Sequence, residues 1–475
     1  MILSKFKLPK DLLDFWFDLK KEIFSNKKNA SLILSGTISL LVLLNFFFKF
    51  ITKILSLKNW YNQVKFFKKC NIPGPRPWTL LGSMHEVLRY GFAKNDRKLI
   101  DKYGAIVGYF EGSTPVVVTT DLKFIKNVMV KDFNCFVNRR TFDSLAVEPT
   151  DKFLTSLKDD KWKNVRTIVT TAFTSGKLKS MSKHINDCSN SVEKYVDKLA
   201  DHDGILDTKK IFSCLTLDVI SSCCFGVSIN SICNPENEFN NHLQRIFQNF
   251  QNFSKPIFFP NIAAILSKRK LIELFPSDGF RFFKNFTDII KRDDFIQTML
   301  DFEENNSSID ILVRELELQN DTKLLKWNAD FKKTLTNHEI LSQSILFLLA
   351  GYETTAHTLC FISYCLAMNP KYQDKLCNEI DTVLDYYDGK ISYESVSEMK
   401  YMDNVIDETL RLFPSVIRLD RVASQDYEYN GTVVKKGVVW SLPIWALHHD
   451  PEIYPGPYEF RPERFDEQEK KKETI

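Results

Sequence analysis

The feature that most constrains this 475-residue chain is a long, almost uncharged stretch around residue 350. It begins at Thr336–Glu339 (TNHE), a capping box in which the threonine hydroxyl accepts from an early backbone N–H and the glutamate reaches back. No proline follows until Pro370, and Glu353 is the only charged residue in Ile340–Asn369. The spacing predicts a helix of about 32 residues, about 48 Å long. Its internal polar residues argue against a membrane span and favour a helix through the protein core.

The middle of this predicted helix, Ala350–Thr355 (AGYETT), places an acid next to a hydroxyl and close to a glycine. Glycine in a helix costs ~1 kcal/mol relative to alanine, and burying an unpaired carboxylate costs more. Gly351 would let a ligand approach the backbone, and Thr354 is able to open the helical hydrogen-bond ladder around a small molecule. Glu353 and Thr354 together are able to pass protons to a bound molecule. Taken alone, these residues fit a satisfied structural carboxylate equally well.

A second apolar stretch, residues 30–48, contains nineteen residues without a charge. A helix of that length crosses the hydrocarbon core of a bilayer, which is about 30 Å thick. A cleaved signal peptide fits poorly, because its apolar region is shorter and starts nearer the first residue. We therefore expect a single transmembrane helix behind a pre-anchor segment, residues 1–29. The lysines that follow the span mildly favour a body that faces the cytosol.

The rest of the chain divides into a linker and one large body. Residues 49–78 are basic and end in Ile72–Pro77 (IPGPRP), whose alternating prolines favour an extended, stiff connection. Residues 79–475 contain neither a Gly/Ser-rich linker nor a repeat. Two β-prone patches, residues 105–119 and 427–442, flank a long region of helical periodicity. Gly112 in the first patch and Asn430-Gly431 in the second each predict the turn of a β-hairpin. The predicted fold class is mainly α with a small β-sheet region.

Composition excludes several classes of protein. The chain carries 64 Lys plus Arg against 60 Asp plus Glu, a net charge of +4, which does not suggest a nucleic-acid partner. Hydrophobic residues make up 44% and charged residues 26%, as in ordinary globular proteins. The ten cysteines include no CxxC pair and suggest neither a zinc site nor a disulfide framework. No cysteine follows Cys377.

Further patterns gain meaning from their order along the chain. Trp162 and Arg166 share one helix face, where an indole and a guanidinium suit a carboxylate partner. A surface cation–π pair explains the same spacing. Glu408 and Arg411 also share a face, and Arg464 in the segment PERF is able to complete a network with them.

Together, in this order, these elements resemble the cytochrome P-450 family of haem-thiolate monooxygenases, most of all its microsomal family 3 branch. The resemblance covers roughly residues 70–466. It is carried by IPGPRP, VNRR (137–140), the Trp162/Arg166 pair, FTSGKL (173–178), LDVI (217–220) with Phe225-Gly226, AGYETT, ETLRLFP, RLDRV (418–422) and PERF.

The resemblance implies a bound haem b and a role for each matching residue. Thr354 would hydrogen-bond dioxygen, and Glu353 would feed protons for cleavage of the O–O bond. Ala350 and Gly351 would lie against the haem, and Phe142 would line the substrate pocket. The residues that would hold the haem propionates are Arg139, Trp162, Arg166 and Arg421.

The resemblance also implies a structural network and several partners. Glu408, Arg411 and Arg464 would brace the proximal side of the haem as a buried ion network. Substrates would be lipophilic molecules of the xenobiotic, steroid or fatty-acid-like kind. Lys161 and Lys163 would meet an acidic, NADPH-dependent reductase, whose approach long-range charge attraction would speed. The implied location is the endoplasmic reticulum membrane, with a single span and the body facing the cytosol.

One expected part of the pattern is missing. In the family, the axial thiolate comes from a cysteine in a Phe- and Gly-rich loop after PERF, and it favours O–O cleavage. This chain has no such cysteine before Ile475, so we expect a P-450-like fold that is incomplete at its carboxyl end and lacks its metal ligand. Two interpretations follow. The chain is an incomplete version of a working monooxygenase, or a truncated, catalytically dead product that acts, if at all, as a membrane-bound protein for lipophiles or the reductase.

Overall fold

The computed structural model describes residues 58, 60–79, 81–141, 148–201, 204–234, 236–252, 281–282, 335–467 and 469. The predicted pre-anchor segment, the predicted transmembrane helix and Phe142 lie outside the described residues. The chain divides into two compact units, which we describe separately. The smaller unit comprises Met1–Phe66 and Pro77–Leu80, and the larger one comprises Phe67–Arg76 and Leu81–Ile475. In the smaller unit, Trp60 Nε1 donates to Pro77 O at 2.8 Å.

The predicted linker, residues 49–78, belongs in part to the body. Residues 60–69 are helical, and Phe67–Arg76 lies within the larger unit. Gly108 N donates to Pro73 O at 2.8 Å. Gly74 approaches the backbone of Gly108 so closely that a Cβ would lie 1.8 Å from Gly108 O. Because a glycine permits this contact, the proline-rich stretch pairs with the larger unit, and the domain bounds expected from the sequence stay a prediction.

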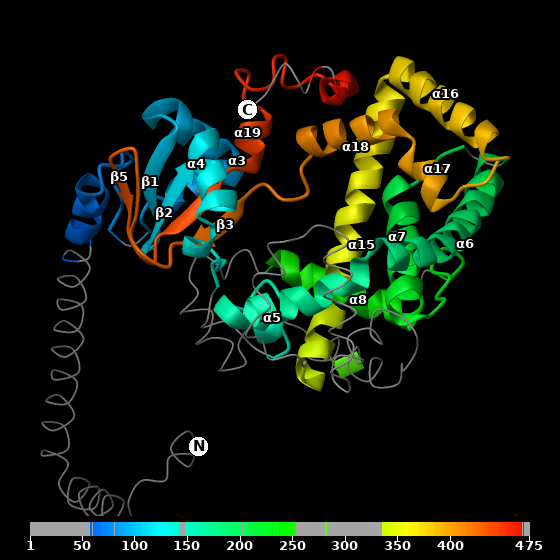
Figure 1. Ribbon diagram of the computed structural model, residues 1–475, viewed down its shortest axis with the longest axis horizontal. Coiled ribbons are helices and arrows are strands. Elements are labelled where there is room, and N and C mark those ends of the chain that lie inside the picture. Colours follow the sequence, from blue (N-terminus) through cyan, green and yellow to red (C-terminus); the bar gives the residue numbers. More distant parts are fainter. Residues whose placement is uncertain are drawn as a thin grey trace, which may run out of the picture. The chain divides into compact units, whose positions relative to one another are not determined.

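The first predicted β patch and the end of the second join in one four-stranded sheet of the larger unit (Figure 1). β1 (Ile106–Glu111) and β2 (Thr114–Thr119) form the predicted antiparallel hairpin. β6 (Val439–Leu442) adds to β2 in parallel, and β3 (Leu419–Val422) pairs with β6 in antiparallel fashion. The order β1-β2-β6-β3 thus joins the first and last thirds of the body.

A separate two-stranded hairpin confirms the second turn prediction. β4 (Tyr427–Tyr429) and β5 (Thr432–Val434) are antiparallel. Asn430 and Gly431 between them have φ values of 47° and 76°. Both values lie in the left-handed region that a type I′ turn requires.

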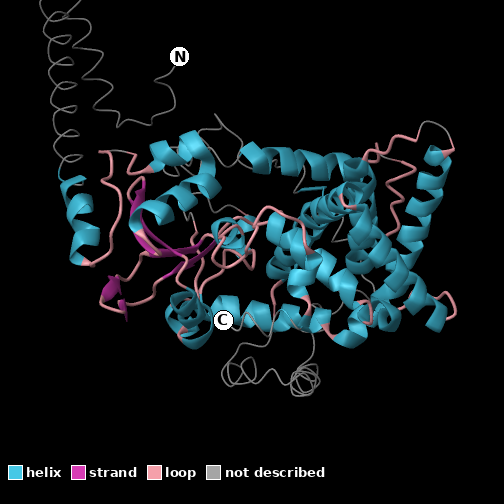
Figure 2. Cartoon of the chain, turned by 90° about the horizontal axis from the view of Figure 1, so that it is seen from above, coloured by secondary structure: helices cyan, strands magenta, loops and turns pink. Residues whose placement is uncertain are grey.

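Helices form most of the rest of the larger unit, as Figure 2 shows. The helices that precede the long one are α3 (Met84–Tyr103), α4 (Leu122–Lys126), α5 (Asp159–Thr170), α6 (Ser175–Ala200), α7 (Thr208–Phe225) and α8 (Glu238–Asn252). Those that follow it are α16 (Pro370–Tyr386), α17 (Tyr393–Ser397), α18 (Lys400–Leu412) and α19 (Ile444–His448). Short π or 3-10 turns are η2 (Asn127–Lys131), η3 (Phe133–Cys135), η5 (Thr150–Lys152), η6 (Thr171–Phe173) and η8 (Pro462–Phe465).

The long helix is confirmed as α15 (Asn337–Met368), with 32 residues and the predicted capping box at Thr336 and Glu339. Within the described part of the chain, it is the one helix long and apolar enough to cross a membrane. Its buried residues nevertheless join a core cluster with side chains of α5 and α7. The helix also contacts α16, α18 and η5, as expected for a helix through the core.

Candidate functional site

Asn138 holds together the three segments that carry the predicted carboxylate-binding residues. Its Nδ2 donates to Asp159 Oδ1, and Asp159 N donates back to Asn138 Oδ1, both at 2.7 Å. Asn138 O accepts from Val422 N at 2.8 Å. Asp159 begins α5, which carries Trp162 and Arg166, while Arg139 and Arg421 neighbour Asn138 and Val422. These bonds therefore bring the four predicted residues into one region.

The guanidinium groups of this region act on one another, and among the described residues Asp420 is the carboxylate that partly offsets their charge. Burial, and then the nearby charge of Arg139, lower the pKa of Arg421 to about 10. Burial and then Arg166 lower the pKa of Arg139. Arg421 Nε is buried and has no hydrogen-bond partner among the described residues. We call Arg139, Arg166 and Arg421 the cation cluster. Its mutual repulsion and its unpaired donor mark a place for an anion.

Phe133 connects Trp162 to the cation cluster. The ring centroids of Phe133 and Trp162 are 6.0 Å apart, and the guanidinium carbon of Arg421 lies 5.9 Å from the centroid of Phe133. Trp162 and Arg421, far apart in the sequence, thus flank one aromatic ring.

Sequence reasoning missed a second charged group behind the cation cluster. Arg418 forms ion pairs with Asp96 and Glu111, and Arg140 with Glu111 and Asp420. Burial alone would raise the pKa of Glu111, but the charges of Arg140 and Arg418 outweigh it and lower that pKa. Asp420 pairs with Arg140 through Oδ2, and its charge also acts on Arg139 and Arg421, where it offsets only part of the lowering of their pKa values. The alternation of strand residues was the available signal, because it places Arg418 and Asp420 on one face.

On α15, Ala350 and Thr354 are exposed along one face of the helix. Thr354 Oγ1 donates to Ala350 O at 2.6 Å, the bond to the preceding turn that threonine commonly makes inside helices. The helix continues through this point without a break. The expected opening of the helical ladder at Thr354 is therefore absent here, because the hydroxyl adds to the ladder.

Glu353 turns from Thr354 toward α7. Its Oε1 lies 3.2 Å from His357 Nε2 and 3.9 Å from Lys209 Nζ, and its side chain is 20% exposed. Neighbouring helix positions point about 100° apart, so the acid and the alcohol occupy different faces. The expected buried, costly carboxylate is thus partly exposed and paired.

Gly351 contacts α7. A Cβ there would lie 2.9 Å from Ile220 Cδ1, so the missing side chain lets the two helices approach. This close packing explains why a glycine stands at position 351, which the sequence alone did not show. The predicted contact of Gly351 with haem stays a prediction.

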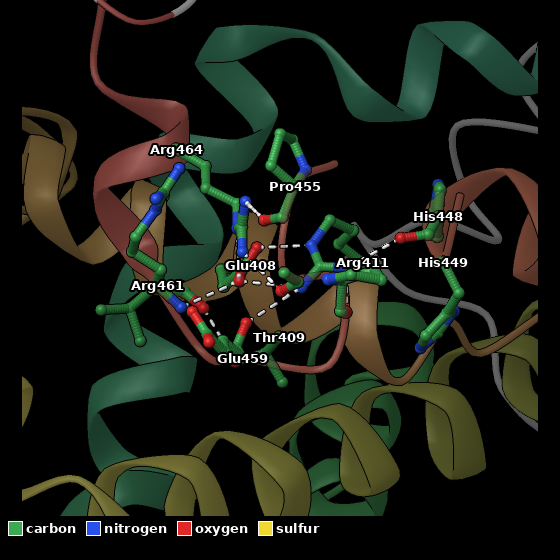
Figure 3. Close-up of polar contacts among 12 residues, drawn as sticks. Glu408, Thr409, Arg411, His448, His449, Pro455, Glu459, Arg461 and Arg464 are labelled. Atoms are coloured by element: carbon green, nitrogen blue, oxygen red, sulfur yellow. Dashed lines mark hydrogen bonds and ion pairs between the residues drawn. The ribbon is translucent and has the colours of Figure 1, made fainter. Parts of the chain in front are cut away.

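Glu408, Arg411 and Arg464 meet in a buried network (Figure 3). Arg411 donates to both carboxylate oxygens of Glu408, at 2.7 and 2.9 Å, and Arg464 Nε donates to Glu408 Oε1 at 3.3 Å. The three side chains are 0–2% exposed. The other guanidinium donors reach main-chain carbonyls of His448, Pro455, Gly456, Pro457 and Glu459. The network therefore holds the end of α19 and residues 455–459 to α18 and η8.

His448 makes this region sensitive to acid. Burial lowers the pKa of His448 to about 4, whereas an unfolded histidine titrates near about 6.5. Between these values the unfolded chain binds a proton that the folded chain does not, so stability should fall by about 3 kcal/mol as the pH drops from about 6.5 to 4. Urea unfolding at several pH values measures this dependence. The variant His448→Gln should flatten it, and equal slopes in both proteins would contradict the assignment.

The chain is similar to known proteins over most of its length. The family model described as Cytochrome P450 matches residues 72–474. Cytochrome P450 3A31 of Mesocricetus auratus is 36% identical over 439 residues, which cover 88% of this chain and 84% of the relative. Cytochrome P450 3A2 of Rattus norvegicus is 38% identical over 412 residues, 85% of this chain and 78% of the relative. Cytochrome P450 3A56 of Fundulus heteroclitus is 37% identical over 435 residues, which cover 89% of this chain and 82% of the relative.

Proposed function

Because this chain belongs to the cytochrome P450 family and is by that family a haem-dependent monooxygenase, we propose that it oxidises lipophilic xenobiotics or steroids. An NADPH-dependent reductase would supply the electrons. Lys161, which is exposed near the start of α5, would take part in docking that reductase. The anchor at residues 30–48 would hold the protein in the endoplasmic reticulum membrane with its body toward the cytosol. Phe142, outside the described residues, would line the substrate pocket.

The cation cluster is the observation that carries this proposal, because it fits haem b. Haem b has two propionate carboxylates, and guanidinium groups bind carboxylates through charge-assisted hydrogen bonds. Arg139, Arg166 and Arg421 would hold them, and Arg421 Nε would gain the partner that it lacks among the described residues. Trp162 would add its indole N–H. When bound, the haem supplies the oxidation chemistry itself.

Glu353 and Thr354 of α15 would transfer protons to the site. Thr354 Oγ1, on the exposed face beside Ala350, would hold a proton near the bound haem. Glu353 Oε1 has proton donors on its other side, His357 Nε2 and Lys209 Nζ. A rotation of the Glu353 side chain would carry a proton from these groups toward Thr354. Glu408, Arg411 and Arg464 would hold the end of α19 and residues 455–459 in place.

The propionate assignment is tested by titrating the purified chain with haem and with haem dimethyl ester, which lacks both carboxylate charges. Hydrogen bonds between charged groups are worth about 1.5–3 kcal/mol, so we expect haem to bind about tenfold more tightly, or better. Arg166→Gln changes an exposed residue of α5 and should remove most of this preference. Arg89→Gln, an exposed arginine of α3, is the matched control and should leave it intact. Equal affinities of the original chain for haem and ester would refute the assignment.

A further inference from the structure

Gln343, which the proposed function does not use, connects α15 to the segment that leads into α5. Its side chain is 0% exposed. Gln343 Nε2 donates to Lys152 O at 2.7 Å, and its Oε1 accepts from Leu154 N at 3.0 Å. An amide side chain offers a donor and an acceptor together, so one residue pairs the main-chain groups on both sides of Phe153.

The segment that Gln343 holds is part of the core. Phe153, Leu154 and Leu157 are buried in the same cluster as Val165 of α5 and Leu348 of α15. Residue 157 is followed almost directly by α5, which begins at Asp159. Apolar packing alone sets no unique register, whereas two directional hydrogen bonds do. Gln343 therefore determines where residues 150–157, and with them the start of α5, lie along α15.

The position of Gln343 on its helix links this clamp to the candidate site. Ala350 and Thr354 follow it by seven and eleven residues, and these spacings return to nearly the same helix face. The face of α15 that fixes residues 150–157 is thus the face that exposes Ala350 and Thr354 further along. Trp162 and Arg166 lie on α5, at the other end of the clamped connection.

We propose that Gln343 is a positioning residue for the carboxylate-binding site. By holding residues 150–157, it sets the distance between Arg166 and Trp162 on α5 and the exposed face of α15. It acts through main-chain groups and touches neither the cation cluster nor Thr354. The identity of the bound group rests on the proposed function, but the clamp itself does not.

Two variants and a matched control test the inference. Gln343→Met keeps the length of the side chain and removes both hydrogen bonds. Gln343→Glu keeps the acceptor for Leu154 N and regains the donor when protonated. Ser344→Ala is the control, because Ser344 is also buried on α15 but donates within its own helix, to Ile340 O at 2.9 Å.

The first measurement is amide hydrogen exchange of residues 150–157 in the haem-free chain. Unpairing two buried main-chain groups should speed exchange there about tenfold or more in Gln343→Met, and less in Gln343→Glu. Residues of α18 should keep their protection, and the Ser344→Ala control should match the original chain. Unchanged exchange of residues 150–157 in Gln343→Met would overturn the inference.

The second measurement is the preference for haem over haem dimethyl ester. A purely structural role would weaken binding of both compounds equally, whereas a positioning role should lower the preference for haem about as much as Arg166→Gln does. An unchanged preference in both Gln343 variants would overturn the positioning role. If the original chain showed no preference for haem over haem dimethyl ester, the proposed function would be refuted. The hydrogen exchange of residues 150–157 would still test whether Gln343 holds that segment.

Discussion

Replacing Glu408 by glutamine should lower the free energy of unfolding by about 3–5 kcal/mol, the usual loss when one partner of a buried ion pair is removed. Glutamine keeps the shape of the side chain, so no cavity contributes. The loss arises because Arg411 and Arg464, 1% and 2% exposed, would be left without the carboxylate that both contact. Chemical unfolding followed by circular dichroism measures the change.

An exposed ion pair provides the control for Glu408→Gln. Lys435 Nζ lies 2.8 Å from Asp426 Oδ2 on the surface of the hairpin β4–β5. Because solvent screens such pairs, Asp426→Asn should lower the free energy of unfolding far less than Glu408→Gln does. Comparable losses in the two variants would show that the buried network does not carry the stability assigned to it.

Thr354→Ala should sharply reduce the product formed per reductant consumed, by about tenfold or more, and should release hydrogen peroxide instead. The measurement needs a haem-loaded protein that receives electrons from an NADPH-dependent reductase. The variant removes the hydroxyl that lies on the exposed face of α15 and donates to Ala350 O. Without the Thr354 hydroxyl, no group at this position would accept a proton from Glu353.

Thr354→Ser is the matched control, because it retains the hydroxyl and removes only a methyl group. It should keep most of the coupling between reductant and product. If Thr354→Ala formed as much product per reductant as the unsubstituted enzyme, the role proposed for the Thr354 hydroxyl in moving protons would be refuted.

Local patterns predicted the elements of the fold that depend on neighbouring residues. The capping box at Thr336 and the absence of proline before Pro370 predicted α15 with its observed length. Asn430 and Gly431 predicted the tight hairpin, because few other residues adopt positive φ values without strain. Both signals lie within one element, so no distant contact was needed to interpret them.

The sequence did not predict the contacts between distant segments. Nothing local indicated that β6 would lie between β2 and β3. The turn of Glu353 toward Lys209 depends on where α7 packs, and that packing uses the bare backbone of Gly351. The clamp by Gln343 was equally hidden, because its partners are main-chain atoms that any residue could provide. The spacing of Glu408 and Arg411 was visible in the sequence, but their burial depends on the end of α19 and on residues 455–464, which lie far along the chain.

The most direct measurement is a crystal structure of the haem-loaded chain. The account predicts that both propionates contact the cation cluster and Trp162, with Arg421 Nε paired, and that the porphyrin lies against Ala350 and Thr354. Haem bound elsewhere, or propionates directed to solvent while the cation cluster keeps its unpaired donor, would contradict it.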